Sequence, residues 1–318
     1  MSAEHGKKII GIGLATIDQL ICWQSVNEPV LGNTVTQYDM QGGGMTATAL
    51  VAAARLGGSA EFWGVVGDDV FGRLIIEGLK REGVGVTHLR RVKGQEGPVV
   101  LVCIDAKSGE RHFLRGKAFY EWQGRLGSPK SLDGAGCILV DQFRMNNCGH
   151  ILSAARSHGI PIVGDMSCRC PFLPEVDIAV LSSVHGLPPG CGDDAHKACR
   201  AIRTLGPHTV VITLGAHGLV AYNGSEFIKL PAYKVDTVDT TGAGDTFHGA
   251  FCFGLVNGLP LKLNLAFSSA VAALKCMRLG GRAGIPSLHG TLDFLKERDP
   301  DALGQIIEAA PGWNDGMQ

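Results

Sequence analysis

The sequence lacks an excess of charge of either sign. Its 318 residues carry 29 Lys and Arg against 30 Asp and Glu, which gives a formal net charge of −1 at pH 7. Proteins that hold nucleic acids or anionic membranes usually present a basic field, and this composition supplies none. The sequence therefore favours a small-molecule substrate over a nucleic-acid or membrane partner.

Long apolar runs are also lacking. The apolar stretch 9–21 is broken by Gly11, Gly13 and Asp18 and has no small-residue cleavage site, so we interpret it as a buried strand rather than a signal peptide. No other stretch is long enough to cross a bilayer. We therefore expect a cytoplasmic protein.

The ten cysteines lack the spacing of a metal site or a disulfide framework. Many lie within apolar runs such as 102–104 and 136–138, which is typical of reduced, buried thiols. The one tight pair, Cys168 and Cys170, has neither a CxxC spacing nor a nearby histidine. We interpret both cysteines as structural.

Apolar runs of strand length alternate with helical patterns along most of the chain. Strands are predicted over 8–17, 61–66, 98–105, 137–142, 161–165, 178–182 and 209–214, and helices over 46–56, 71–82, 151–158, 195–205, 246–257 and 261–277. Continuous apolar strands are typical of a sheet covered on both faces, and the alternation indicates βαβ units. The predicted fold is α/β with a mainly parallel sheet, in a single domain over 1–318.

Two stretches do not fit this alternation. Residues 22–41, and the strands 98–105 and 111–115 joined by a turn at 107–109, have the pattern of antiparallel ribbons. We interpret the segments near 22–41 and 98–115 as a small β-sheet lid. Such a sheet has an apolar face that a second copy could cover, so a homodimer through the lid is predicted.

The strongest chemical signal is the segment 239–246, which reads DTTGAGDT and leads into an apolar helix. Its small residues let the backbone approach an anion, and the first N–H groups of a helix, here those of Ala243, Gly244 and Asp245, can bind a phosphoryl group. A carboxylate there would repel phosphate unless it took the proton of an incoming hydroxyl, which predicts that Asp245 is a general base. The alternative for GAG alone is an ordinary Asp-Gly turn that caps a helix.

The same segment resembles the DTTGAGD signature of the ribokinase-like (PfkB) kinases. Further matches follow in the family's order: the Gly43-Gly44 pair before a small-residue helix, VVGDD at 65–69 and VITLGAHG at 211–218. The resemblance implies a Rossmann-like sheet with helices on both faces, a small β lid, and transfer of a phosphoryl group from ATP to a hydroxymethyl carbon. It also implies Mg²⁺ and leaves a role for K⁺ open.

The resemblance assigns roles by position. Catalysis would fall to Gly242, Ala243, Gly244 and Asp245; sugar binding to Asp18, Gly43, Gly44 and Thr48; and nucleotide binding to Thr213, Gly215, Gly218, Cys276, Gly280 and Gly281. Each minor group has a simpler alternative, because Asp18 could be a loop carboxylate and the glycines could form turns or a hairpin.

Two positions depart from the family's pattern. Thr48 stands where the family usually has a sugar-binding Asn, and the segment 182–185, SSVH, stands where many members carry Asn-x-x-Glu near the metal. Hydroxyl recognition at Thr48 is thus changed, and metal ligands are left unassigned. His217 and His248 are interpreted as structural.

The run 273–286, with Gly42–Gly44 and 47–49, resembles the branch that contains bacterial sulfofructose kinases. Those act on the 1-hydroxyl of a ketose with a 6-sulfonate, and an anionic tail would need cationic partners, for which Arg115 and Arg144 are the candidates. Each of these arginines could instead be a solvated surface charge. A neutral ketose such as fructose is the alternative acceptor.

Other functions are weighed against the sugar kinase. A nucleoside or small-alcohol kinase would use the same machinery, since fold and anion site do not fix the acceptor. A nucleotide-binding regulator without turnover would be expected to lack Asp245. A dinucleotide oxidoreductase is disfavoured because Gly11-Ile12-Gly13 has no third glycine and no following helix.

Overall fold

The computed structural model describes residues 7–23, 35–105, 111–120, 126, 132–143 and 148–313. Nine strands form one large sheet, in which the seven from β11 to β5 are parallel and β12 and β13 are antiparallel. Their spatial order is β13 (Phe227–Leu230), β12 (Leu219–Tyr222), β11 (Thr209–Thr213), β10 (Ile178–Ser182), β9 (Ile162–Asp165), β8 (Ala135–Asp141), β1 (Lys8–Ile12), β4 (Ala60–Gly67) and β5 (Leu89–Val92). The predicted mainly parallel sheet is confirmed.

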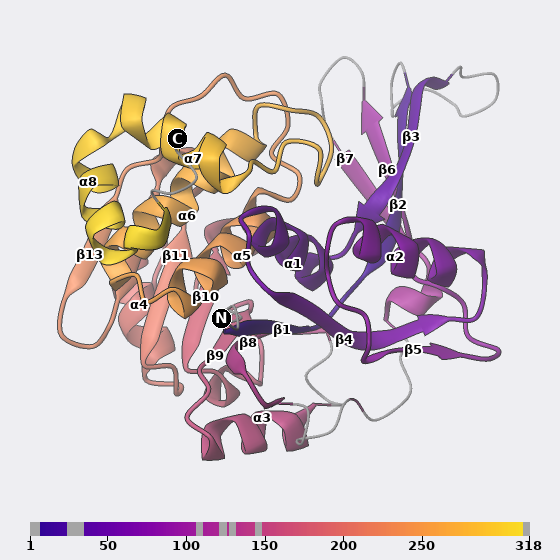
Figure 1. Ribbon diagram of the computed structural model, residues 1–318, viewed down its shortest axis with the longest axis horizontal. Helices are drawn as coiled ribbons and strands as arrows, with labels where there is room; N and C mark the ends of the chain where they lie inside the picture. Colours follow the sequence, from indigo (N-terminus) through magenta and orange to yellow (C-terminus); the bar gives the residue numbers. More distant parts are fainter. Residues whose placement is uncertain are drawn as a thin grey trace.

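Helices cover both faces of this sheet, as Figure 1 shows. Successive residues of a central strand face opposite sides, so Ile9 packs into one core and Ile10 into the other. The first core is closed by α1 (Met45–Arg55), α2 (Val70–Arg81), α5 (Ala243–Val256), α6 (Leu261–Lys275), α7 (Leu288–Arg298) and α8 (Pro300–Ala309), and the second by α3 (Gly149–Ser157) and α4 (Ala195–Arg203).

A separate four-stranded sheet stands at one end of the molecule (Figure 1). Its order is β3 (Val35–Gly43), β2 (Thr16–Trp23), β6 (Val99–Asp105) and β7 (Arg111–Arg115). The β2–β3 and β6–β7 pairs are antiparallel, whereas β2 and β6 run parallel. One row of this sheet places Asp18 beside Gln41 on one side and Val100 on the other, with Arg115 next to Val100.

The single strand predicted over 8–17 is wrong, because the chain changes sheets within it. β1 ends at Ile12, and β2 begins at Thr16 in the small sheet. Gly13 lies in the bend, where a Cβ would overlap the Thr46 hydroxyl and the Asp141 carboxylate. A bend that brings the backbone this close to buried side chains requires glycine.

Among the described residues, no helix is both long and apolar enough to cross a membrane.

Candidate active site

The start of α5 presents unused backbone donors. Gly242, with φ 74°, forms the N-cap, and Thr246 N–H donates to Gly242 O at 2.9 Å. Within the described part of the chain, the N–H groups of Gly244 and Asp245 have no hydrogen-bond acceptor. Free N–H groups at the positive end of a helix form a site for a phosphoryl oxygen or another anion.

The carboxyl ends of the central strands bring acidic side chains next to this helix. Asp141 ends β8 and Asp165 ends β9, and the two residues are direct partners in the parallel ladder. Burial, and the neighbouring charge of Asp165, raise the pKa of Asp245 to about 7. His248 opposes this shift, and its Nε2 lies 3.5 Å from Asp165 Oδ1. A carboxyl poised near neutral pH is suited to accept a proton from a substrate hydroxyl.

His248 is held by backbone carbonyls of α5 and β10. Its Nδ1 lies 2.7 Å from Gly244 O, and its Nε2 lies 3.4 Å from Val180 O. Burial lowers the pKa of His248. Both ring nitrogens thus face the protein, and the ring fixes the first turn of α5 against β10.

Asp18 lies on β2 in contact with the backbone of Gly43. The Thr16 hydroxyl donates to Asp18 Oδ1 at 2.6 Å, and a Cβ on Gly43 would overlap the carboxylate. Gly44, at φ 88°, is the N-cap of α1, and a side chain there would meet Leu14 O. Burial raises the pKa of Asp18, although its hydrogen bond to Thr16 opposes the shift.

Arg282 approaches these glycines from the C-terminal loop. Its Nη2 donates to Gly43 O at 2.8 Å, and its Nε donates to Thr48 Oγ1 at 3.2 Å. Its side chain is buried, and the residue is only 8% exposed. Burial lowers the pKa of Arg282 to about 10, while the charges of Asp18 and Asp245 oppose that effect. A cation therefore lies within electrostatic reach of both candidate carboxylates.

The loop that carries Arg282 also contacts the start of α5. Asp239 accepts from the N–H of Thr241 through one oxygen and from the N–H of Gly280 through the other, each at 2.7 Å. The fully buried Lys275 donates from Nζ to Asp239 O at 2.8 Å. A Cβ on Gly242 would overlap Gly281 O, so glycine is needed at that contact. The segments around 239–245 and 280–282 therefore form one rigid unit.

The other predicted nucleotide residues follow β11. Thr213 ends the strand and donates to Leu181 O at 3.2 Å, while Gly215 and Gly218 both have positive φ, at 57° and 87°. Cys276 O accepts from the N–H groups of Val238 and Asp239, so its backbone carries the link to α5.

The described residues contain no cluster of three or more His, Cys, Asp or Glu side chains placed to hold a metal ion. Mg²⁺ in phosphoryl-transfer sites is held largely by substrate phosphates and water, with one or two carboxylates. Asp141 accepts hydrogen bonds through both oxygens, and burial raises the pKa of Asp165 and Asp245, so Mg²⁺ would be held mainly by the nucleotide phosphates and water.

Comparison with known proteins identifies the family. Residues 7–288 match the pfkB family of carbohydrate kinases. The chain belongs to the PfkB family. It is 30% identical over 278 residues to ribokinase of Schizosaccharomyces pombe, covering 77% of this chain and 84% of that protein. The prediction of a PfkB carbohydrate kinase is confirmed.

Solved structures of similar shape confirm the fold. A ribokinase described from Agrobacterium tumefaciens superposes with a TM-score of 0.84 at 24% identity, over 92% of this chain and 98% of that one. Arabidopsis thaliana ribokinase, complexed with ribose and ATP, gives a TM-score of 0.81 at 23% identity, over 92% and 99% of the two chains. The PfkB kinase thus has the α/β architecture with a small second sheet that its sequence predicts.

The structure brings two predicted groups together in this PfkB kinase. Asp18 and Gly43 are in contact, and the charges of Asp18 and Asp245 act on one another. Arg115 shares the sheet row of Asp18 but is exposed, and its guanidinium stacks 5.2 Å from the Phe119 ring centroid. Arg144 lies outside the described residues.

Sequence reasoning missed Asp141, Asp165 and Arg282. The two aspartates end predicted strands, and the carboxyl ends of parallel strands gather at one edge of a sheet, so this signal was available. Arg282 had no such signal, because it follows two glycines in a loop and its partners are more than 200 residues away in sequence.

Proposed function

We propose that this PfkB kinase transfers the γ-phosphoryl group of ATP to a hydroxymethyl group of a ketose-like sugar. Asp245 would take the proton of the attacking hydroxyl, and the N–H groups of Gly244 and Asp245 would bind the transferred phosphoryl oxygens. Asp18, Gly43 and Gly44 would hold the sugar. Gly215, Gly218, Cys276, Gly280 and Gly281, with Thr213, would line the nucleotide site.

One observation carries this proposal: a carboxyl whose pKa is about 7 lies beside unused helix N–H groups. Asp245 thus supplies both the base, through its side chain, and part of the anion site, through its N–H, which suits in-line attack on a bound phosphoryl group. Bound Mg²⁺ would neutralise charge on the phosphates, and K⁺ stays a prediction. The A. thaliana relative was solved with ribose and ATP, which supports the same pair of substrate classes here.

The acceptor is proposed from the small sheet. The row Gln41–Asp18–Val100–Arg115 places these side chains on one face, the face of Asp18. Arg115 could reach an anionic tail on a sugar held by Asp18, which favours 6-deoxy-6-sulfofructose over fructose. We propose that this sheet acts as a lid that excludes water, since water would otherwise compete for the phosphoryl group.

The test is ADP release by the purified protein with sugars, sugar acids and nucleosides, followed by fructose, fructose 6-phosphate and 6-deoxy-6-sulfofructose. A charged hydrogen bond contributes about 1.5–3 kcal/mol, so Arg115→Ala or Arg144→Ala should lower kcat/KM for the anionic ketoses about ten- to a hundredfold. Fructose should be little affected, and Arg90→Ala on β5 serves as the control.

Two results would overturn parts of this proposal. Response to nucleosides alone would exclude a sugar acceptor. Equal losses for all three ketoses, or a wild type that prefers fructose, would exclude an anionic substrate while leaving the kinase intact.

A further inference from the structure

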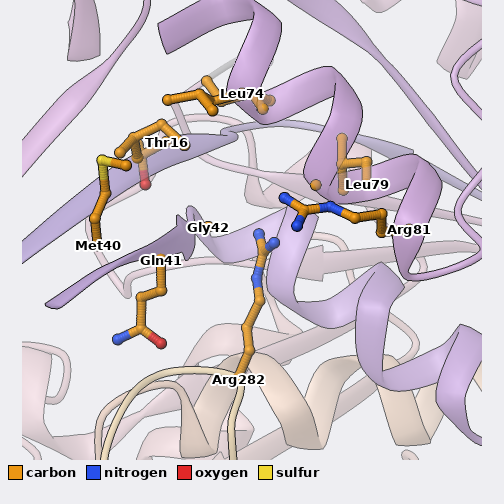
Figure 2. A pocket seen from close by; sticks show the side chains of 11 residues that line it. Thr16, Met40, Gln41, Gly42, Leu74, Leu79, Arg81 and Arg282 are labelled. Carbon is orange, nitrogen blue, oxygen red and sulfur yellow. The ribbon is translucent and has the colours of Figure 1, made fainter.

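A small cleft lies beside the candidate sugar site, at the base of the small sheet. It has a volume of about 80 Å³ and opens between α2 and the ends of β2 and β3. Two arginines line it from opposite sides: Arg81 in the last turn of α2 and Arg282 from the C-terminal loop. Figure 2 shows their guanidinium groups pointing toward each other, with Gln41 and Gly42 along the wall.

One nitrogen of Arg282 is directed at this cleft. Nε and Nη2 are used by Thr48 and Gly43, whereas Nη1 has no hydrogen-bond acceptor among the residues that the structure describes. Nη1 lies against Gly42, where any Cβ would overlap it. Nη1 is not one of the described buried atoms that lack a partner, so it is open to the cleft, where water or a ligand atom can pair with it.

The charges around the cleft leave it cationic. Glu82, the acid next to Arg81, is held by Arg55, which donates from Nε and Nη2 to its two carboxylate oxygens at 2.8 Å each. Within the described ranges, no carboxylate forms an ion pair with Arg81 or Arg282. Asp18, Glu82 and Asp245 act on Arg282 through their charges, and Glu82 also acts on Arg81, but Asp18 Oδ1 is bonded to Thr16 and both Glu82 oxygens are bonded to Arg55.

We propose that this cleft is a binding site for a small tetrahedral oxyanion, held between Arg81 and Arg282. Two guanidinium groups that face one space repel each other, and an anion between them removes that repulsion while pairing Nη1. The volume suits a phosphate- or sulfonate-sized group. Occupancy would tie α2 to Gly42 and Gly43, the residues where the small sheet joins α1.

The oxyanion has two chemical sources: free inorganic phosphate, or the anionic tail of an acceptor that reaches Arg81 and Arg282 instead of Arg115. The second source rests on the proposed function, whereas the site itself does not. Free phosphate would act as an effector on the junction of the two sheets, and an acceptor tail would act as a specificity contact.

The experiment is calorimetric titration of inorganic phosphate at constant ionic strength, with saturating non-hydrolysable ATP analogue so that the start of α5 is filled. Wild type is compared with Arg81→Gln and with Arg73→Gln, which changes an exposed arginine of the same helix that does not line the cleft. A dissociation constant of about 1 mM is expected for wild type and Arg73→Gln, and binding at least about tenfold weaker for Arg81→Gln.

No binding to wild type, or equal binding by all three proteins, would overturn the site whether or not the protein phosphorylates a sugar. Steady-state kinetics then shows whether the bound oxyanion is free phosphate or the tail of the acceptor. Phosphate that competes with fructose 6-phosphate, together with a raised KM for that sugar alone in Arg81→Gln, identifies the acceptor's tail. Phosphate that changes kcat with fructose as acceptor identifies a free effector.

Discussion

Arg282 Nε donates a 3.2 Å hydrogen bond to the hydroxyl of Thr48, a residue 234 positions earlier in the chain. The resemblance to PfkB kinases implies that Thr48 replaces an asparagine that would bind the sugar. The threonine hydroxyl here is engaged by an arginine whose Nη2 also holds Gly43 O. Thr48 is therefore the acceptor that positions the buried guanidinium beside Gly43.

Thr48→Val is expected to destabilise the protein by about 1.5–3 kcal/mol, because it keeps the shape but leaves the buried Nε without an acceptor. Thr48→Ser keeps the hydroxyl and should cost far less. Urea unfolding of the three proteins measures the difference. A Thr48→Val protein as stable as wild type would show that the hydrogen bond contributes nothing to stability.

Asp245→Asn should abolish most turnover while ATP binding changes little, because the amide keeps the shape but accepts no proton. The expected loss of kcat is about 10²- to 10⁴-fold, nearer the lower end if proton transfer is late in a loose transition state. ADP-release kinetics and calorimetric ATP titration measure the two effects. Wild-type kcat in this variant would remove Asp245 from the mechanism.

The pH dependence follows from the pKa of Asp245, raised from an ordinary 3.8 to about 7. The base is protonated below that value, so kcat/KM should fall about tenfold per pH unit below pH 7. Since the folded state binds the extra proton between pH 3.8 and 7, stability from this group is lost as pH rises through that window. The free energy of unfolding of Asp245→Asn, relative to that of wild type, should therefore be about 1–3 kcal/mol higher at pH 8 than at pH 5.

Two measurements check these consequences: a pH–rate profile, and urea unfolding of both proteins at pH 5 and pH 8. The charges of Asp165 and Asp245 act on one another, so Asp245→Asn also changes the titration of Asp165, and the comparison reports the pH dependence of the pair. A flat rate between pH 5 and 8, or a stability difference that does not grow with pH, would contradict the assignment.

The sequence predicted six strands of the large sheet, β1, β4, β8, β9, β10 and β11, because each is a mainly apolar run. It did not predict β5, β12 and β13, which are only four residues long, and β5 carries two arginines. It predicted the start of β2 poorly. The apolar run continues from β1 through 13–15 into β2, and nothing in hydrophobicity marks the change of sheet. Only the packing of Thr46 and Asp141 against Gly13 reveals why the chain bends there.

The candidate site, too, was predicted from the sequence only in part. Asp245 and its glycines are contiguous, so one motif predicts them. The pKa of Asp245 was not predictable, because it depends on burial and on Asp165, which a different strand supplies. The environment of Arg282 could not be predicted either, since it depends on long-range contacts with α1 and β3.

The last prediction concerns self-association through the small sheet. Its face opposite Asp18 carries exposed apolar side chains: Met40 is 44% exposed, and Tyr38 and Leu114 are each 58% exposed. Strand register places Met40, Gln19, Leu101 and Leu114 in one row across all four strands, so these residues share that face.

These exposed apolar side chains are expected to be covered by a second copy, which predicts a homodimer at micromolar concentration. Leu114→Lys should convert the dimer to a monomer, because a charge on the edge strand β7 would be buried against the second copy. Leu205→Lys, at a 48% exposed leucine just beyond α4, should leave the dimer unchanged. Light scattering measures the mass of each protein, and a wild type that is monomeric at micromolar concentration would refute the dimer.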